Sequence, residues 1–183
     1  VSLVLDGGTE IEENTGFKAE LSKGAVVYMQ AGGGVWHTSR RDMDQRMHGF
    51  QLWVSLPPEL EKSNATSHYL KNEEVVIKDN VRIILGEYQG VKSPIEDAND
   101  MSYLQVSLKK GEQWTYKPPK THNVLWLQVY QGELDKFKKD EVVVVDNSNE
   151  AITVEALEDT SLVLGSAAKF DHDLHLGRPS VHT

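Results

Sequence analysis

The sequence predicts an all-β protein made of two tandem antiparallel β-barrels. Three observations support this: short apolar segments recur along the chain, Gly, Asn, Asp or Pro separates them, and hardly any stretch has helical periodicity. Eleven segments have the length and the β-branched or aromatic composition of strands. They cover residues 1–5, 25–30, 49–56, 74–78, 81–88, 102–108, 113–117, 123–131, 141–145, 152–156 and 161–167. Short strands separated by turn residues are typical of sandwiches and barrels.

The division into two barrels follows from a repeated pattern. An apolar strand ends in Asp6-Gly7-Gly8 in the first half and in Gln131-Gly132-Glu133 in the second, as in the hairpins of small barrels. Between them, glycines, a proline and an acidic run break the strand pattern over residues 86–100, where we place a linker. We therefore predict domains at residues 1–90 and 91–183. Two short stretches, residues 40–47 and 57–62, favour helical connectors.

Composition excludes several classes of protein. The 183 residues include 19 Lys and Arg against 28 Asp and Glu, a net charge of −9, which disfavours direct binding to nucleic acid. Since the chain has no cysteine, it has no disulfide, thiolate metal site or cysteine nucleophile. No apolar run reaches the roughly 18 residues of a membrane span, and the given sequence does not open with a charged n-region followed by an apolar h-region. We expect a cytoplasmic protein, or a nuclear one in a eukaryote, without a membrane partner.

Residues 23–39, KGAVVYMQAGGGVWHTS, carry the strongest functional signal. A strand leads to three consecutive glycines, which allow a tight turn, and His37 follows on the returning strand at a barrel mouth. The segment resembles the second metal-binding signature of cupin barrels, specifically that of the pirin family. Residues 49–57, GFQLWVSLP, resemble the next pirin strand almost residue by residue, and Tyr69 falls where pirins keep a tyrosine. Residues 173–177 and 180–183 resemble the segment that closes pirin-like proteins.

The resemblance implies a bicupin, with two jelly-roll barrels and the pocket in the N-terminal one. Pirins typically bind one Fe(II) through three histidines and a glutamate. His37 matches the third histidine and is the one metal ligand that we assign in this chain. Ser39 stands at the glutamate position, so a strong anionic ligand is missing there. The chain begins at Val1 within a strand, so we expect a longer protein whose first signature, His-Pro-His, lies upstream.

Other histidines favour structural interpretations. His37 itself could be a barrel-mouth histidine bonded to its neighbours without a metal. His122 stands alone where a metal-binding cupin has a His-x-His pair, so we expect the second barrel to be structural and to bind no metal. His172 and His175 lie in a tail without turn chemistry to fix them, which favours a polar closing segment.

Three functions are compatible with this sequence. The resemblance implies a quercetin 2,3-dioxygenase-like oxygenase, with Trp36 and Trp53 flanking a pocket for a flat flavonoid, although barrel tryptophans are more often core residues. The alternative is a regulatory binding protein, since some pirins act as cofactors of transcription regulators, and an acidic surface suits a basic protein partner. The third is a degenerate cupin that has lost its metal.

Overall fold

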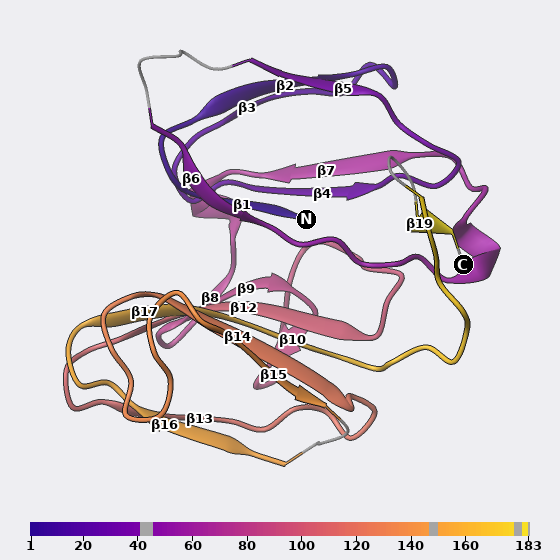
Figure 1. The fold of residues 1–183 in the computed structure, drawn as a ribbon. Helices are drawn as coiled ribbons and strands as arrows, with labels where there is room; N and C mark the ends of the chain where they lie inside the picture. Colours follow the sequence, from indigo (N-terminus) through magenta and orange to yellow (C-terminus); the bar gives the residue numbers. More distant parts are fainter. Residues whose placement is uncertain (41–45, 147–149, 178–180, 183) are drawn as a thin grey trace. The chain divides into compact units, whose positions relative to one another are not determined.

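The computed structural model describes residues 1–40, 46–146, 150–177 and 181–182 (Figure 1). Strands and two short 3₁₀ helices make up the regular structure of these residues, and all the paired strands in the two large sheets are antiparallel. The predicted all-β fold class is thus confirmed. No helix in the described part of the chain is long and apolar enough to cross a membrane. The chain divides into two compact units, one of Val1–Val75 with Asp171–Thr183, the other of Val76–Phe170.

The first unit contains two facing sheets and a small C-terminal hairpin. Its elements are β1 (Ser2–Asp6), β2 (Thr9–Glu13), β3 (Lys18–Leu21), β4 (Val26–Gln30), β5 (His37–Arg40), β6 (His48–Gln51), η1 (Pro58–Leu60), β7 (Thr66–Leu70), η2 (Asn72–Glu74), β18 (His175–Leu176) and β19 (Val181–His182). One sheet has the order β6-β1-β4-β7 and the other β3-β2-β5, while β18 pairs with β19. In Figure 1 the three-stranded sheet forms a layer over β1, β4 and β7.

A shared apolar core joins these two sheets. Val4 and Val27 come from the four-stranded sheet, and Ile11 and Leu21 come from the three-stranded sheet; with Ala25 they form one buried cluster. Strand β2 alternates strictly between buried and exposed residues, so every second side chain points to the space between the sheets. This alternation defines the inner face of the first barrel.

The second unit is built around a larger sheet. Its strands are β8 (Ile77–Lys78), β9 (Val81–Leu85), β10 (Glu87–Tyr88), β11 (Val91–Lys92), β12 (Met101–Leu108), β13 (Gln113–Tyr116), β14 (Val124–Gln131), β15 (Val142–Asp146), β16 (Ile152–Glu155) and β17 (Thr160–Ala167). The six-stranded sheet has the order β15-β14-β17-β12-β9-β8, and β13 pairs with β16. Leu104, Leu127 and Leu164 from the large sheet and Trp114 and Val154 from the small one share one core cluster.

The observed units differ from the predicted domains of residues 1–90 and 91–183. The division falls after Val75, and the tail from Asp171 onwards belongs to the first unit. Gly86 and Gly90 have positive φ angles of 73° and 81° and border the β10–β11 hairpin inside the second unit. These glycines therefore mark a hairpin rather than a linker, which is why the break in the strand pattern misplaced the boundary.

Several elements differ from the expected strands. Strands β2, β3, β5 and β7 were not predicted from the sequence, because charged and polar residues leave each of them without an apolar run. Strand β6 ends at Gln51; Leu52 still exchanges two backbone hydrogen bonds of 2.8 Å with Val1, and residues 53–56 have no strand assignment. The helical connector expected at residues 57–62 is the short η1, whereas most of the one expected at residues 40–47 lies outside the described residues.

Candidate metal centre

A tight glycine turn positions His37 at the start of β5. The Gly34 amide donates to the Ala31 carbonyl at 2.9 Å, and the Gly33 amide donates to the Ser63 carbonyl at 2.9 Å. Gly32 has a φ of 53°, and a Cβ there would lie 2.2 Å from the Ser63 oxygen, so this position accepts only glycine. The turn therefore fixes where the returning strand begins and, with it, the place of His37.

The strand register places His37 on the barrel-facing side. Strand β5 pairs with β2 so that His37 lies opposite Glu13 and Ser39 lies opposite Ile11. Residues directly opposite each other in an antiparallel pair point to the same face. Because Ile11 belongs to the buried core, His37 and Ser39 share its face, although both are solvent-exposed on this edge strand. The metal role assigned to His37 stays a prediction.

Glu13 is a buried carboxylate on this inner face. Its exposed fraction is 4%, and both of its carboxylate oxygens accept from Ser67 Oγ, at 2.8 and 2.9 Å. Thr15 Oγ1 donates to Oε2 at 2.9 Å. Ser67 lies on β7 in the four-stranded sheet, so the Glu13 side chain bridges the two sheets of the barrel. Within the described part of the chain, no ion pair involves Glu13.

Sequence reasoning missed Glu13, although a signal existed. The run Thr9-Glu10-Ile11-Glu12-Glu13 has period-two alternation around Ile11, which assigns Glu13 to the side of the apolar residue. Because charged residues surround it, the run was not recognised as a strand. Among the residues that the structure describes, no three His, Asp or Glu side chains gather closely enough to hold a metal. The strand register does place an imidazole, His37, opposite a carboxylate, Glu13, and both are donor types that divalent transition metals accept.

Two tryptophans of the first unit, Trp36 next to His37 and Trp53 after β6, are exposed rather than buried in the core. Trp36 and Trp53 expose 83% and 71% of their surface. The Trp36 backbone is fixed by Asn14, whose amide donates to the Trp36 carbonyl at 2.9 Å and whose Oδ1 accepts from the Trp36 amide at 3.0 Å. The core interpretation of these rings is therefore excluded, and both are available to an aromatic ligand.

A shallow hollow of about 420 Å³ lies over the same sheet. Apart from Ile11 and Ala19, its lining comes from polar and charged residues: Glu10, Glu12, Lys18, Glu20, Thr38 and Arg40. Glu12 and Lys18 already form an ion pair at 2.7 Å. Since Glu10 and Glu12 occupy the exposed positions of β2, this hollow belongs to the outer face and is separate from the side of Glu13 and His37.

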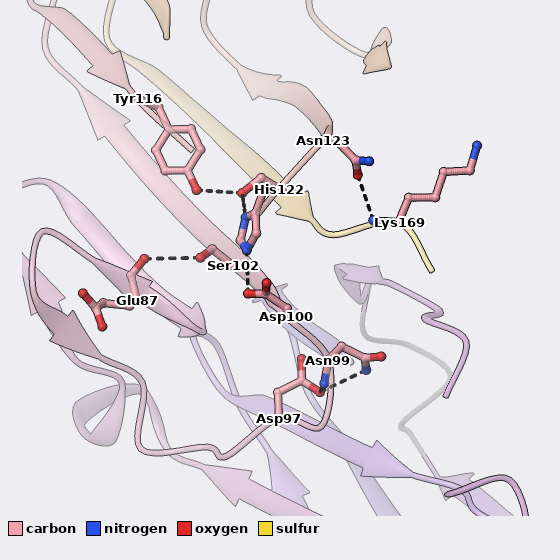
Figure 2. Close-up of polar contacts among 10 residues, drawn as sticks. Glu87, Asp97, Asn99, Asp100, Ser102, Tyr116, His122, Asn123 and Lys169 are labelled. Atoms are coloured by element: carbon pink, nitrogen blue, oxygen red, sulfur yellow. Dashed lines mark hydrogen bonds and ion pairs between the residues drawn. The ribbon is translucent and has the colours of Figure 1, made fainter. Parts of the chain in front are cut away.

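In the second unit, His122 lies in a buried polar network (Figure 2). Its Nδ1 is hydrogen bonded to Ser166 Oγ at 2.7 Å, and its Nε2 to Asp100 Oδ1 at 3.0 Å. The Tyr116 hydroxyl is hydrogen bonded to the same Ser166 oxygen at 2.7 Å. A hydrogen bond from Thr121, followed by the bond and charge of His122, holds the pKa of Asp100 below its usual range despite partial burial.

The Ser166, His122 and Asp100 contacts have the distances of a nucleophile–base–acid triad, but their burial opposes that function. Ser166 is 1% exposed and His122 is 2% exposed. Ser166 Oγ already contacts both Tyr116 and His122, so a substrate carbonyl cannot reach it. Both His122 nitrogens have protein partners, so neither is free to bind a metal. We therefore interpret the network as a polar connection that joins β13 and β17 to the segments just before β12 and β14.

Comparison with known proteins indicates the family. The family model described as Pirin matches residues 1–54. The pirin-like protein of Caulobacter vibrioides is 28% identical over 176 residues, which cover 90% of this chain and 63% of that protein. Human pirin is 31% identical over 125 residues, or 66% of this chain and 43% of that protein. The structure of quercetin 2,3-dioxygenase from Acinetobacter baumannii matches with a TM-score of 0.86 at 20% identity, covering 99% of this chain and 68% of that one. In sequence and in fold, the chain resembles the pirin family.

A second solved structure supports the same pirin fold. Bacterial pirin YhhW from Escherichia coli, in complex with nickel(II), has a TM-score of 0.74 at 20% identity, covering 92% of this chain and 72% of that one. The chain described here spans 63% of the Caulobacter relative and 43% of human pirin. The expected bicupin architecture is confirmed by these structural matches.

Proposed function

We propose that this pirin-like protein is a metal-dependent oxygenase of the quercetin 2,3-dioxygenase type, with its pocket in the first barrel. The observation that carries the proposal is the register of β2 and β5, which sets the His37 imidazole opposite a buried carboxylate on the inner face. The fold match to the Acinetobacter dioxygenase and the nickel(II) complex of YhhW support a metal site in this fold. We propose one divalent ion, Fe(II), as the cofactor, with two further histidines from an upstream His-x-His motif.

The residues of this chain would bind the metal and orient the substrate, and would not themselves react. His37 donates a ring nitrogen, which requires the neutral imidazole. The exposed rings of Trp36 and Trp53 offer apolar faces for a flat flavonoid. When bound, the metal supplies the positive charge and redox chemistry that bring a deprotonated flavonol and dioxygen together. The protein then contributes the position of both reactants.

Turnover of quercetin tests this proposal. The protein with its native N-terminal sequence is loaded with Fe(II) without oxygen, then mixed with quercetin in aerated buffer while the flavonol absorbance is followed. We expect oxygen-dependent loss of quercetin that His37→Ala abolishes and the exposed His48→Ala leaves unchanged. If metal-loaded protein binds iron stoichiometrically but does not consume quercetin or related flavonols, the oxygenase function is refuted.

A role in binding a regulatory protein is the second candidate, and one observation favours it. Strand β15 lies at the edge of the six-stranded sheet, and its Val142 and Val144 are exposed apolar side chains. Within the described residues no further strand pairs with this edge, and such an edge can pair with a strand of another protein. Val144→Lys should abolish capture of a transcription regulator and leave flavonol turnover unchanged. Metal content distinguishes the oxygenase from a degenerate cupin, which would bind no metal, whereas capture of a partner identifies the regulatory protein.

A further inference from the structure

We infer that Glu13, on the strand beside His37, supplies the carboxylate of the metal centre that Ser39 cannot provide. This inference rests on the metal site of the proposed function and adds a ligand that the pirin signature does not contain. The signature expects the acid two residues after the histidine, on the same strand. In this chain the acid, Glu13, lies on the neighbouring strand β2 instead.

The register brings Glu13 closer to His37 than a residue at position 39 would be. Glu13 and His37 are directly opposite each other, which places their Cβ atoms about 4.5–5.5 Å apart. Position 39 shares the face but lies two residues further along β5, opposite Ile11. A carboxylate at residue 13 and an imidazole at residue 37 can therefore approach one ion between them.

The hydrogen bonds of Glu13 leave capacity for a cation. An ionised carboxylate has about four lone-pair sites, whereas a hydroxyl has a single proton to donate. Ser67 and Thr15 together supply two protons, although Ser67 Oγ lies within hydrogen-bonding distance of both carboxylate oxygens. About two acceptor sites are thus unfilled by the residues that contact Glu13. The two hydroxyls hold the carboxylate in place, as partners of metal-binding carboxylates commonly do.

Burial gives a second reason for a cation at this place. Glu13 is 4% exposed, and a buried carboxylate is unfavourable unless a positive charge or sufficient donors compensate it. Among the described residues, the side chains that donate hydrogen bonds to its carboxylate are the neutral hydroxyls of Ser67 and Thr15. Its neighbour Glu12, on the same strand but on the outer face, is exposed and paired with Lys18. The same residue type therefore has opposite surroundings on the two faces of β2.

Calorimetric titration with Ni²⁺ tests the inference without any activity assay. The protein with its native N-terminal sequence is compared with Glu13→Gln, which keeps the shape and an acceptor for Ser67, and with Glu12→Gln, which removes an equal charge from the outer face. Loss of a direct ligand should lower affinity by more than the tenfold typical of an indirect partner, or more than about 1.4 kcal/mol. Glu12→Gln should stay within about twofold.

Moving the carboxylate provides the decisive comparison. Ser39→Glu introduced into Glu13→Gln should restore Ni²⁺ affinity to within about tenfold of the wild type, because both positions share the inner face. If Glu13→Gln binds Ni²⁺ as the wild type does while His37→Ala does not, Glu13 is only a structural bridge and the inference fails alone. If neither variant loses affinity, the metal site of the proposed function fails as well. If Glu13→Gln does not fold, Glu13→Asp, which shortens the reach, must weaken Ni²⁺ binding or the inference is refuted.

Discussion

Replacing His122 by Ala removes a buried side chain that is hydrogen bonded at both ring nitrogens. The Ser166 bond is fully buried and contributes about 0.5–1.5 kcal/mol. The Asp100 bond contributes less, since that carboxylate is half exposed. The cavity left by the imidazole adds a packing loss of the kind measured for large-to-small core substitutions. Together these losses predict that the free energy of unfolding falls by about 2–4 kcal/mol.

Urea denaturation followed by circular dichroism measures this loss, and His48→Ala provides the control. His48 is exposed at the start of β6, so its removal should change the free energy of unfolding by less than about 0.5 kcal/mol. Ni²⁺ affinity should be the same in His122→Ala as in the wild type, because His122 belongs to the second unit. A destabilisation below about 0.5 kcal/mol, or a large loss of Ni²⁺ binding, would refute the structural role of His122.

Three further outcomes are expected. Gly32→Ala should destabilise the protein by about 1–3 kcal/mol and weaken Ni²⁺ binding, because the added Cβ meets the Ser63 carbonyl. Thermal unfolding and calorimetric titration measure the two effects, and an unchanged stability and Ni²⁺ affinity would reject the role of the turn. The hydrogen bond from Thr121 is the largest cause that holds the pKa of Asp100 below its usual value, so the stability that Asp100 contributes is present above its unfolded-state pKa and is lost as pH falls through its folded-state pKa. Asp100→Asn should therefore reduce the loss of unfolding free energy at acid pH, and an unaltered dependence of that free energy on pH would contradict this. Trp53→Ala should weaken flavonol binding by fluorescence titration while changing stability by less than about 0.5 kcal/mol, and equal flavonol affinity would exclude this ring from the pocket.

The apolar strands could be predicted from the sequence, whereas the polar ones could not. Strands β12, β14 and β17 are long, rich in Val and Leu and central to their sheet, so composition alone indicates them. Strands β2 and β5 carry Glu, Thr, Ser, Arg and His, and their pairing with each other is what makes them strands. Tertiary pairing overrides propensity at the very place where the site is built.

Of the two residues proposed as metal ligands in this chain, the sequence predicted His37 but not Glu13. The glycine turn and the histidine after it are adjacent in sequence, so the motif indicates the position of His37. Glu13 is 24 residues away from His37 along the printed sequence and reaches it only through the strand register. The glycines at 86 and 90 show the converse error, because a turn inside a domain has the same sequence pattern as a linker between domains.

The most direct test of a metal centre in the first barrel is the Ni²⁺ affinity of His37→Ala beside that of His122→Ala, both in the protein with its native N-terminal sequence. We predict that His37→Ala loses more than about tenfold in affinity and keeps its stability, since its side chain is exposed. His122→Ala should lose stability and keep its affinity. Equal Ni²⁺ affinity in His37→Ala and the wild type would contradict the metal centre.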